Sequence, residues 1–151
     1  MEYIHIVKDF ALRTQKNLDY INEQQSEGRE AYEITQLINS MLGLLIFPQQ
    51  NYFNAIPKKP LELLKNEGWP IPQVDGYFEQ VKDLNQLVRY LRNAVAHFNI
   101  EFIADGKGEI VALKVWNYNP KEQRIDWQAR LYINDLRQFT KRFVDLIQEY
   151  N

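Results

Sequence analysis

The sequence places three side chains that can act together on a phosphodiester in one short run, RNAVAH at residues 92–97. Arg92 keeps its positive charge at any working pH, whereas histidine, here His97, is the side chain whose charge changes near neutral pH. A guanidinium can bind a phosphate group, and an imidazole can take or give a proton beside it. The run, with Asn93 next to the arginine, therefore predicts a ribonuclease site that requires no metal ion.

On a helix, these residues fall into two groups. With about 3.6 residues per turn, Asn93 and His97 lie one turn apart on one line, which Arg89 extends by a further turn. We expect this line to face outward, opposite the apolar stripe of the same helix. Arg92 precedes His97 by five positions, which is about 140° around the helix. Either its side chain curls round, or the helix loosens at Phe98, or Arg92 serves a histidine of a second protomer.

A structural explanation of the same run is also open. An arginine a few positions before a histidine is common by chance in a chain of this composition, and a histidine at a helix C-terminus is favoured by the helix dipole. The context favours a functional site, because the run ends a long core helix and small alanines surround His97.

Other candidate residues carry less specific chemistry. Arg89 and Lys82 are candidate RNA contacts, although each could equally be a solvated surface charge. His5 lies beside an apolar helix stripe, which favours a structural role. With no cysteine and only two histidines, the chain offers little material for a metal site. It also lacks a Walker loop, a dinucleotide fingerprint and zinc-ligand spacing, so we expect neither a metal nor a cofactor.

Composition places the chain among ordinary globular proteins. It has 151 residues, 45% hydrophobic and 25% charged, which predicts one domain spanning residues 1–151. The net charge of −2 argues against clamping nucleic acid over a long footprint, but it permits a short RNA segment at a local basic patch. The N-terminus does not resemble a signal peptide, and the longest apolar run, residues 41–47, is too short to cross a bilayer. We therefore expect a cytoplasmic protein with no membrane contact.

Hydrophobic periodicity predicts five helices, at about residues 1–23, 30–46, 61–66, 75–97 and 134–150. Pro48 is expected to end the second, and Asn134 to cap the last. The aromatic connection at 47–60 is interpreted as a cover for the core, with a base-stacking surface as the alternative. The fourth and fifth helices carry the clearest core stripes: Val81, Leu84, Val88, Leu91, Val95 and Phe98, and then Leu136, Phe139, Phe143, Leu146 and Tyr150.

Between these two helices the period changes to that of β-structure. Residues 100–105, 109–118 and 124–133 predict three short antiparallel strands, with Trp116 and Trp127 packed in the core. The predicted fold is therefore mainly α. It is a bundle of four to five helices with a small three-stranded β-meander, at about residues 99–133, inserted before the C-terminal helix.

The segment LVRYLRNAVAHFNIEF resembles the signature of the HEPN superfamily, in which an arginine, a polar residue, a short spacer and a histidine end a helix of a helical bundle. The segments ITQLINSMLGLLIFPQQNYF and GWP are similar to those of a plasmid- and defence-associated HEPN nuclease group. The resemblance implies a metal-independent endoribonuclease that acts as a homodimer. It also implies a toxin or an antiphage effector, and a nuclease of that kind has an antitoxin or a regulatory protein as a partner.

The resemblance also implies a role for each residue of the run. His97 would be the general acid or base, Arg92 would hold the scissile phosphate, and Asn93 would orient the phosphate or His97. With the 2′-hydroxyl as the internal nucleophile, the product would carry a 2′,3′-cyclic phosphate. Two other functions remain as alternatives: a catalytically inactive module that binds nucleotides, RNA or a protein, and a domain whose alanine-lined face only dimerises.

Overall fold

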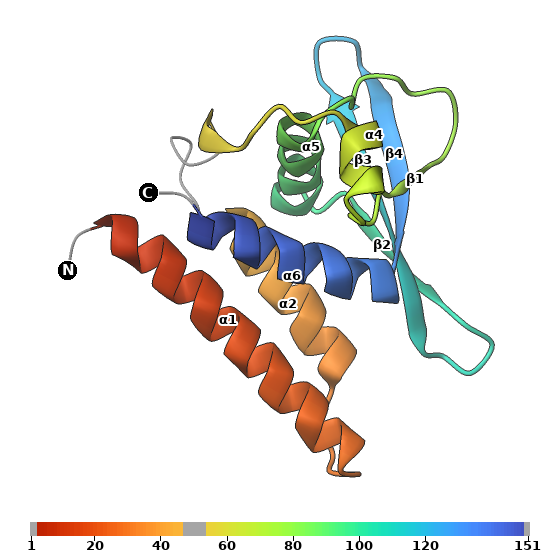
Figure 1. The fold of residues 1–151 in the computed structure, drawn as a ribbon. Coiled ribbons are helices and arrows are strands. Elements are labelled where there is room, and N and C mark those ends of the chain that lie inside the picture. Colours follow the sequence, from red (N-terminus) through yellow and green to blue (C-terminus); the bar gives the residue numbers. More distant parts are fainter. Residues whose placement is uncertain (1–2, 47–53, 150–151) are drawn as a thin grey trace.

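The fold is mainly α with one four-stranded antiparallel sheet, and the computed structural model describes residues 3–46 and 54–149 (Figure 1). The helices of this part are α1 (Tyr3–Ser26), α2 (Glu33–Ile46), α4 (Leu61–Asn66), α5 (Leu84–Ala96) and α6 (Ile133–Glu149). The strands are β1 (Gln73–Val74), β2 (Ile100–Ala104), β3 (Ile110–Asn119) and β4 (Arg124–Tyr132).

Helices α1, α2 and α6 pack against one another, and α2 also contacts α5 (Figure 1). This central position explains why the second half of α2 is apolar nearly all round. The buried side chains of α2 include Leu37, Ile38, Met41, Leu44 and Leu45. Helix α2 begins at Glu33, three residues later than predicted, and α1 continues to Ser26. Pro48 lies outside the described residues.

The predicted core stripe of the last helix is largely confirmed. Leu136, Phe139 and Phe143 of α6 are buried and Leu146 is half-buried, whereas Tyr150 lies outside the described residues. The ring of Trp69, which follows α4, meets Phe139 edge-on at 5.7 Å. This contact packs the connection between α4 and the sheet onto α6.

The sheet has the strand order β1-β4-β3-β2, so the meander β2-β3-β4 is confirmed and a fourth strand is added at its edge. Strand β1 has only two residues, both exposed, so no periodic pattern marks it in the sequence. Helix α5 packs on β3 and covers one face of the sheet (Figure 1). Trp127 is buried, as predicted, whereas Trp116 is only half-buried.

Helix α5 is shorter than the predicted helix at 75–97. The chain before it pairs with the chain before α4, since Leu84 N–H donates to Lys59 O at 2.9 Å and Leu61 N–H donates to Lys82 O at 3.0 Å. Asp83 then caps α5, accepting a hydrogen bond from Gln86 N at 2.8 Å. Asp83 is extended in this pairing, with φ −141 and ψ 169, so the helix begins only at Leu84.

Candidate active site at the end of α5

Helix α5 ends in a Schellman motif directly after the RNAVAH run. Phe98 N–H donates to Val95 O at 3.1 Å, and Asn99 N–H donates to Ala94 O at 2.7 Å. His97 is the C-cap residue, and its own N–H still bonds Asn93 O at 3.0 Å. The motif reverses the chain into β2 and leaves the His97 side chain exposed at the end of the helix.

Phe98 occupies the left-handed position of this motif, with φ 57. Glycine is usual there, because a side chain in the left-handed region costs roughly 1–2 kcal/mol. The prediction that Phe98 belongs to the core stripe is wrong, since the side chain is 79% exposed and the stripe ends at Val95. Packing of the Phe98 side chain within the chain therefore does not offset its backbone strain. An exposed, strained aromatic beside His97 is a candidate functional residue.

Asn93 faces the sheet, which corrects the expectation that Arg89, Asn93 and His97 all face outward. Its side chain is half-buried, and its Nδ2 donates to Oδ1 of Asn117 on β3 at 3.4 Å. Arg89 and His97 are exposed as expected. The difference arises because the inserted sheet packs against this flank of α5 and supplies a polar partner.

The partner of Asn93 is itself held by a buried carboxylate. Asn117 Nδ2 donates to Oδ1 of Asp126 on β4 at 2.7 Å, and Asp126 is only 5% exposed. The pairing of β3 with β4 runs from Asn117↔Trp127 to Tyr118↔Ile125, so Asp126 is an extra residue in a β-bulge. In a regular strand, Asp126 and Trp127 would point to opposite faces; the bulge lets both be buried.

Tyr90 of α5 completes this polar cluster. Burial raises the pKa of its hydroxyl, and the negative charge of Asp126 and a hydrogen bond to that carboxylate raise the pKa further. The Tyr90 hydroxyl therefore stays protonated at neutral pH and donates to Asp126. The ring of Tyr90 meets Trp127 edge-on at 5.7 Å. A polar chain thus runs from Tyr90 through Asp126 and Asn117 to Asn93.

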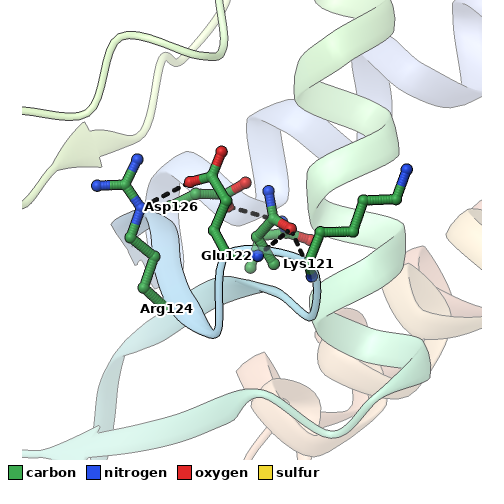
Figure 2. A network of polar contacts seen from close by, with 6 residues as sticks. Lys121, Glu122, Arg124 and Asp126 are labelled. Carbon is green, nitrogen blue, oxygen red and sulfur yellow. Dashed lines mark hydrogen bonds and ion pairs between the residues drawn. The ribbon is translucent and has the colours of Figure 1, made fainter.

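The turn between β3 and β4 adds exposed charges next to this chain. Figure 2 shows Lys121 and Glu122 in this turn, with Arg124 and Asp126 following on β4. Arg124 Nε pairs with Glu122 Oε2 at 2.7 Å, and both side chains are largely exposed. An exposed pair of this kind adds little to stability.

Arg92 and His97 lie on different flanks of α5. The helix remains regular through Ala96, so the separation of about 140° between the two positions holds. The chain does leave the helix at Phe98, but it does so after His97, and this loosening does not turn His97 toward Arg92. The backbone therefore does not support the alternative in which a loosened helix brings Arg92 and His97 together. Arg92 is half-buried, and Ala96 is exposed between the two flanks.

The two candidate RNA contacts lie at different distances from His97. Arg89 is exposed on α5, two turns before His97. Lys82 precedes the helix, about 20 Å from His97 at the rise of about 1.5 Å per residue. The structure thus places Arg89 near the middle of α5, and it places Lys82 before the first residue of the helix, at the end opposite His97. The side chain of His5 lies outside the described residues.

The chain matches the family described as HEPN pEK499 p136, over residues 1–151. The chain belongs to this HEPN family. The predicted superfamily is thereby confirmed, and the RNAVAH run lies at the helix end where the HEPN resemblance places it. Neither a curated protein nor a solved structure matches the chain.

In this HEPN protein, sequence reasoning missed Tyr90, Asn117 and Asp126, and it misplaced Phe98. Asp126 stands between Ile125 and Trp127 in a segment that alternates as a regular strand does, and such a pattern predicts an outward-facing side chain at this position. The β-bulge that turns Asp126 inward does not alter the alternation of apolar and polar residues, so the sequence does not indicate it.

Two further findings concern the described part of this HEPN chain. Its histidines, aspartates and glutamates do not form a group of three or more that could hold a metal ion. None of its helices combines the length and the apolar character that a bilayer crossing requires.

Proposed function

We propose that this HEPN protein is a metal-independent endoribonuclease that acts as a homodimer. The observation that carries the proposal is the end of α5. There His97 is exposed at the helix terminus, and Asn93, one turn before it, is held by a buried polar chain. Family membership supports the same function, because HEPN domains include ribonucleases.

In the proposed reaction, the 2′-hydroxyl oxygen of the substrate attacks the adjacent phosphorus, and the bond to the 5′-oxygen breaks. His97 takes the proton of the 2′-hydroxyl or gives a proton to the leaving 5′-oxygen. An acid–base group in such a position typically contributes about 10²–10⁴-fold to the rate. Arg92 binds the phosphate and stabilises the charge that grows on it. The products are a 2′,3′-cyclic phosphate and a free 5′-hydroxyl.

The separation of Arg92 from His97 on α5 favours a site made by two chains. In a two-fold dimer, Arg92 of one protomer meets His97 of the other, and the pair occurs twice. Ala96 is small and exposed between the two flanks, so a second chain or an RNA strand can approach the helix closely. Arg89 is proposed as a further phosphate contact.

The biological role belongs to the same proposal. The resemblance to plasmid- and defence-associated HEPN nucleases supports a toxin or an antiphage effector whose substrate is RNA. Such a nuclease requires an antitoxin or a regulatory protein to restrain it.

The second candidate function is a catalytically inactive HEPN module that binds RNA, a nucleotide or a protein. The observation that favours it is the same separation of Arg92 from His97, because a single chain does not bring the two residues onto one face.

Incubation of the protein with end-labelled single-stranded RNA in excess EDTA separates these functions. We expect cleavage that leaves cyclic phosphate ends, and we expect His97→Ala and Arg92→Ala each to lower the rate by at least about 10²-fold. Lys16→Ala is the matched control, because it removes an exposed cation of α1 to which no role in the site is assigned. Undiminished cleavage by His97→Ala would sink the mechanism. RNA binding without cleavage by the unchanged protein would favour the inactive module.

A further inference from the structure

We propose that Asp126, acting through Asn117, is a positioning residue that fixes the orientation of the Asn93 carboxamide and directs its oxygen toward the His97 end of α5. This inference deepens the proposed function and rests on it. The residues that carry it come from three elements: Asp126 from β4, Asn117 from β3 and Asn93 from α5.

Asp126 determines which end of the Asn117 carboxamide faces it. An ionised carboxylate only accepts hydrogen bonds, and the Asp126 carboxylate lies in a side chain that is 5% exposed. The group of Asn117 that faces it at 2.7 Å must therefore be the NH₂ group. The other end of the same carboxamide, the acceptor Oδ1, then points toward Asn93.

Asn117 in turn orients Asn93 on α5. Because Asn117 offers only an acceptor to Asn93, the NH₂ group of Asn93 must face it, and the two atoms lie 3.4 Å apart. The carboxamide oxygen of Asn93 is then turned away from the sheet. An asparagine without this partner could present either end, since its two ends are nearly equal in size.

The β-bulge and Tyr90 hold the Asp126 carboxylate in its buried position. The bulge turns Asp126 to the face that bears Trp127, and the Tyr90 hydroxyl supplies a second donor to the carboxylate. A buried charge is costly unless it is paired or hydrogen-bonded. Arg124, two residues before Asp126 on β4, pairs with Glu122 instead (Figure 2). The donors described for Asp126, Asn117 and Tyr90, are uncharged. They fix the orientation of the carboxylate and do not cancel its charge.

Asn93 and Arg92 therefore take different roles in the proposed site. Asn93, one turn before His97, then presents an acceptor that is turned away from the sheet, so it suits a donor such as an imidazole N–H or a ribose hydroxyl. It is poorly suited to hold the phosphate, whose oxygens are acceptors. The phosphate charge therefore falls to Arg92.

Asp126→Asn tests the proposal, because the change keeps the side-chain volume but introduces an amide that can face Asn117 with either end. We expect kcat for single-stranded RNA to fall by about 10- to 100-fold, with KM within about twofold, since a misplaced group weakens the chemical step. Thermal stability should not fall, because a buried charge is removed. Asn117→Leu breaks the same chain while keeping Asp126, and it should give the same split between kcat and KM.

Asp105→Asn is the matched control. It makes the same charge change in the turn between β2 and β3, where Asp105 accepts hydrogen bonds from the backbone of Lys107 and Glu109. Its kcat and KM should equal those of the unchanged protein. Unchanged kcat in either Asp126→Asn or Asn117→Leu overturns the proposal. Loss of activity together with loss of the folded NMR spectrum in both variants also overturns it, because Asp126 would then be structural.

A readout independent of cleavage separates this inference from the proposed function. The side-chain NH₂ signals of Asn93 in a ¹⁵N-labelled sample should be slow to exchange with solvent, and they should shift in Asp126→Asn and in Asn117→Leu but not in Asp105→Asn. If the unchanged protein cuts no RNA, the nuclease proposal fails, and shifted signals still support the positioning of Asn93. Signals that are alike in all four proteins overturn the positioning.

Discussion

At the residue scale, the end of α5 combines strain with exposure. Phe98 takes the left-handed conformation that suits glycine, and it gains little packing in return, being 79% exposed. Strain of this kind is characteristic of functional sites. Its position directly after His97 suits contact with a nucleobase or with a second protomer.

Phe98→Gly should separate strain from function. Relief of the left-handed strain, less the entropy that glycine adds to the unfolded chain, should raise the free energy of unfolding by about 0.5–1 kcal/mol. Urea unfolding measures the change, and RNA cleavage should fall in the same variant. Tyr77→Gly, which removes a fully exposed aromatic outside the left-handed region, should not stabilise the protein. A large loss of stability in Phe98→Gly would contradict the assignment of strain.

At the element scale, one ion pair joins the start of α2 to α6. Arg137 Nε donates to Glu33 Oε1 at 2.7 Å, and its Nη2 pairs with Glu33 Oε2, so the contact is bidentate. The hydrogen bonds that Arg137 donates to the Glu33 carboxylate raise the pKa of Arg137. Glu33 is 6% exposed, whereas Arg137 is partly open to solvent. The carboxylate also lies in the first turn of α2, where the helix dipole favours it.

Arg137→Ala should lower the free energy of unfolding by about 2 kcal/mol, because a nearly buried carboxylate loses its partner. This is below the cost for a fully buried pair, since solvent reaches Arg137. Glu33→Gln combined with Arg137→Ala should recover part of the loss, because the isolated charge is gone. Denaturant unfolding of the two single variants and the double variant measures the coupling. Additive effects would show that the two side chains do not interact.

At the scale of the whole molecule, the helical layer of α1, α2 and α6 lies to one side of the unit formed by α5 and the sheet (Figure 1). The candidate site lies on that second unit, at the junction of α5 with β2. Since α5 carries Arg92 and His97 on different flanks, we expect a second copy of the chain to complete the proposed site.

Mixing two inactive variants tests this arrangement. If Arg92 of one protomer serves His97 of the other, a mixture of Arg92→Ala and His97→Ala should recover about a quarter of the original activity. Half of the dimers then combine the two variants, and each such dimer holds one complete site of two. Light scattering of the unchanged protein should give the mass of a dimer. A mixture as inactive as its components would contradict a shared site, and it would place Arg92 and His97 of one chain together.

Much of the fold could be predicted because it follows from local periodicity. The 61–66 helix, the three strands of the meander and the stripe of α6 all come from apolar residues at regular spacing. The start of α5 could not be predicted, since it depends on pairing of residues 82–84 with residues 59–61. Strand β1 is too short to carry a pattern.

By itself, the sequence determined that Arg92, Asn93 and His97 share the last turns of one helix, because helix geometry depends only on spacing along the chain. Only the tertiary structure decided what those residues face. Asn93 turns to the sheet because Asn117, 24 residues later, accepts its hydrogen bond. Asp126 reaches this network through a bulge that exists only when β3 and β4 are paired. Such contacts join distant parts of the chain, and no local pattern records them.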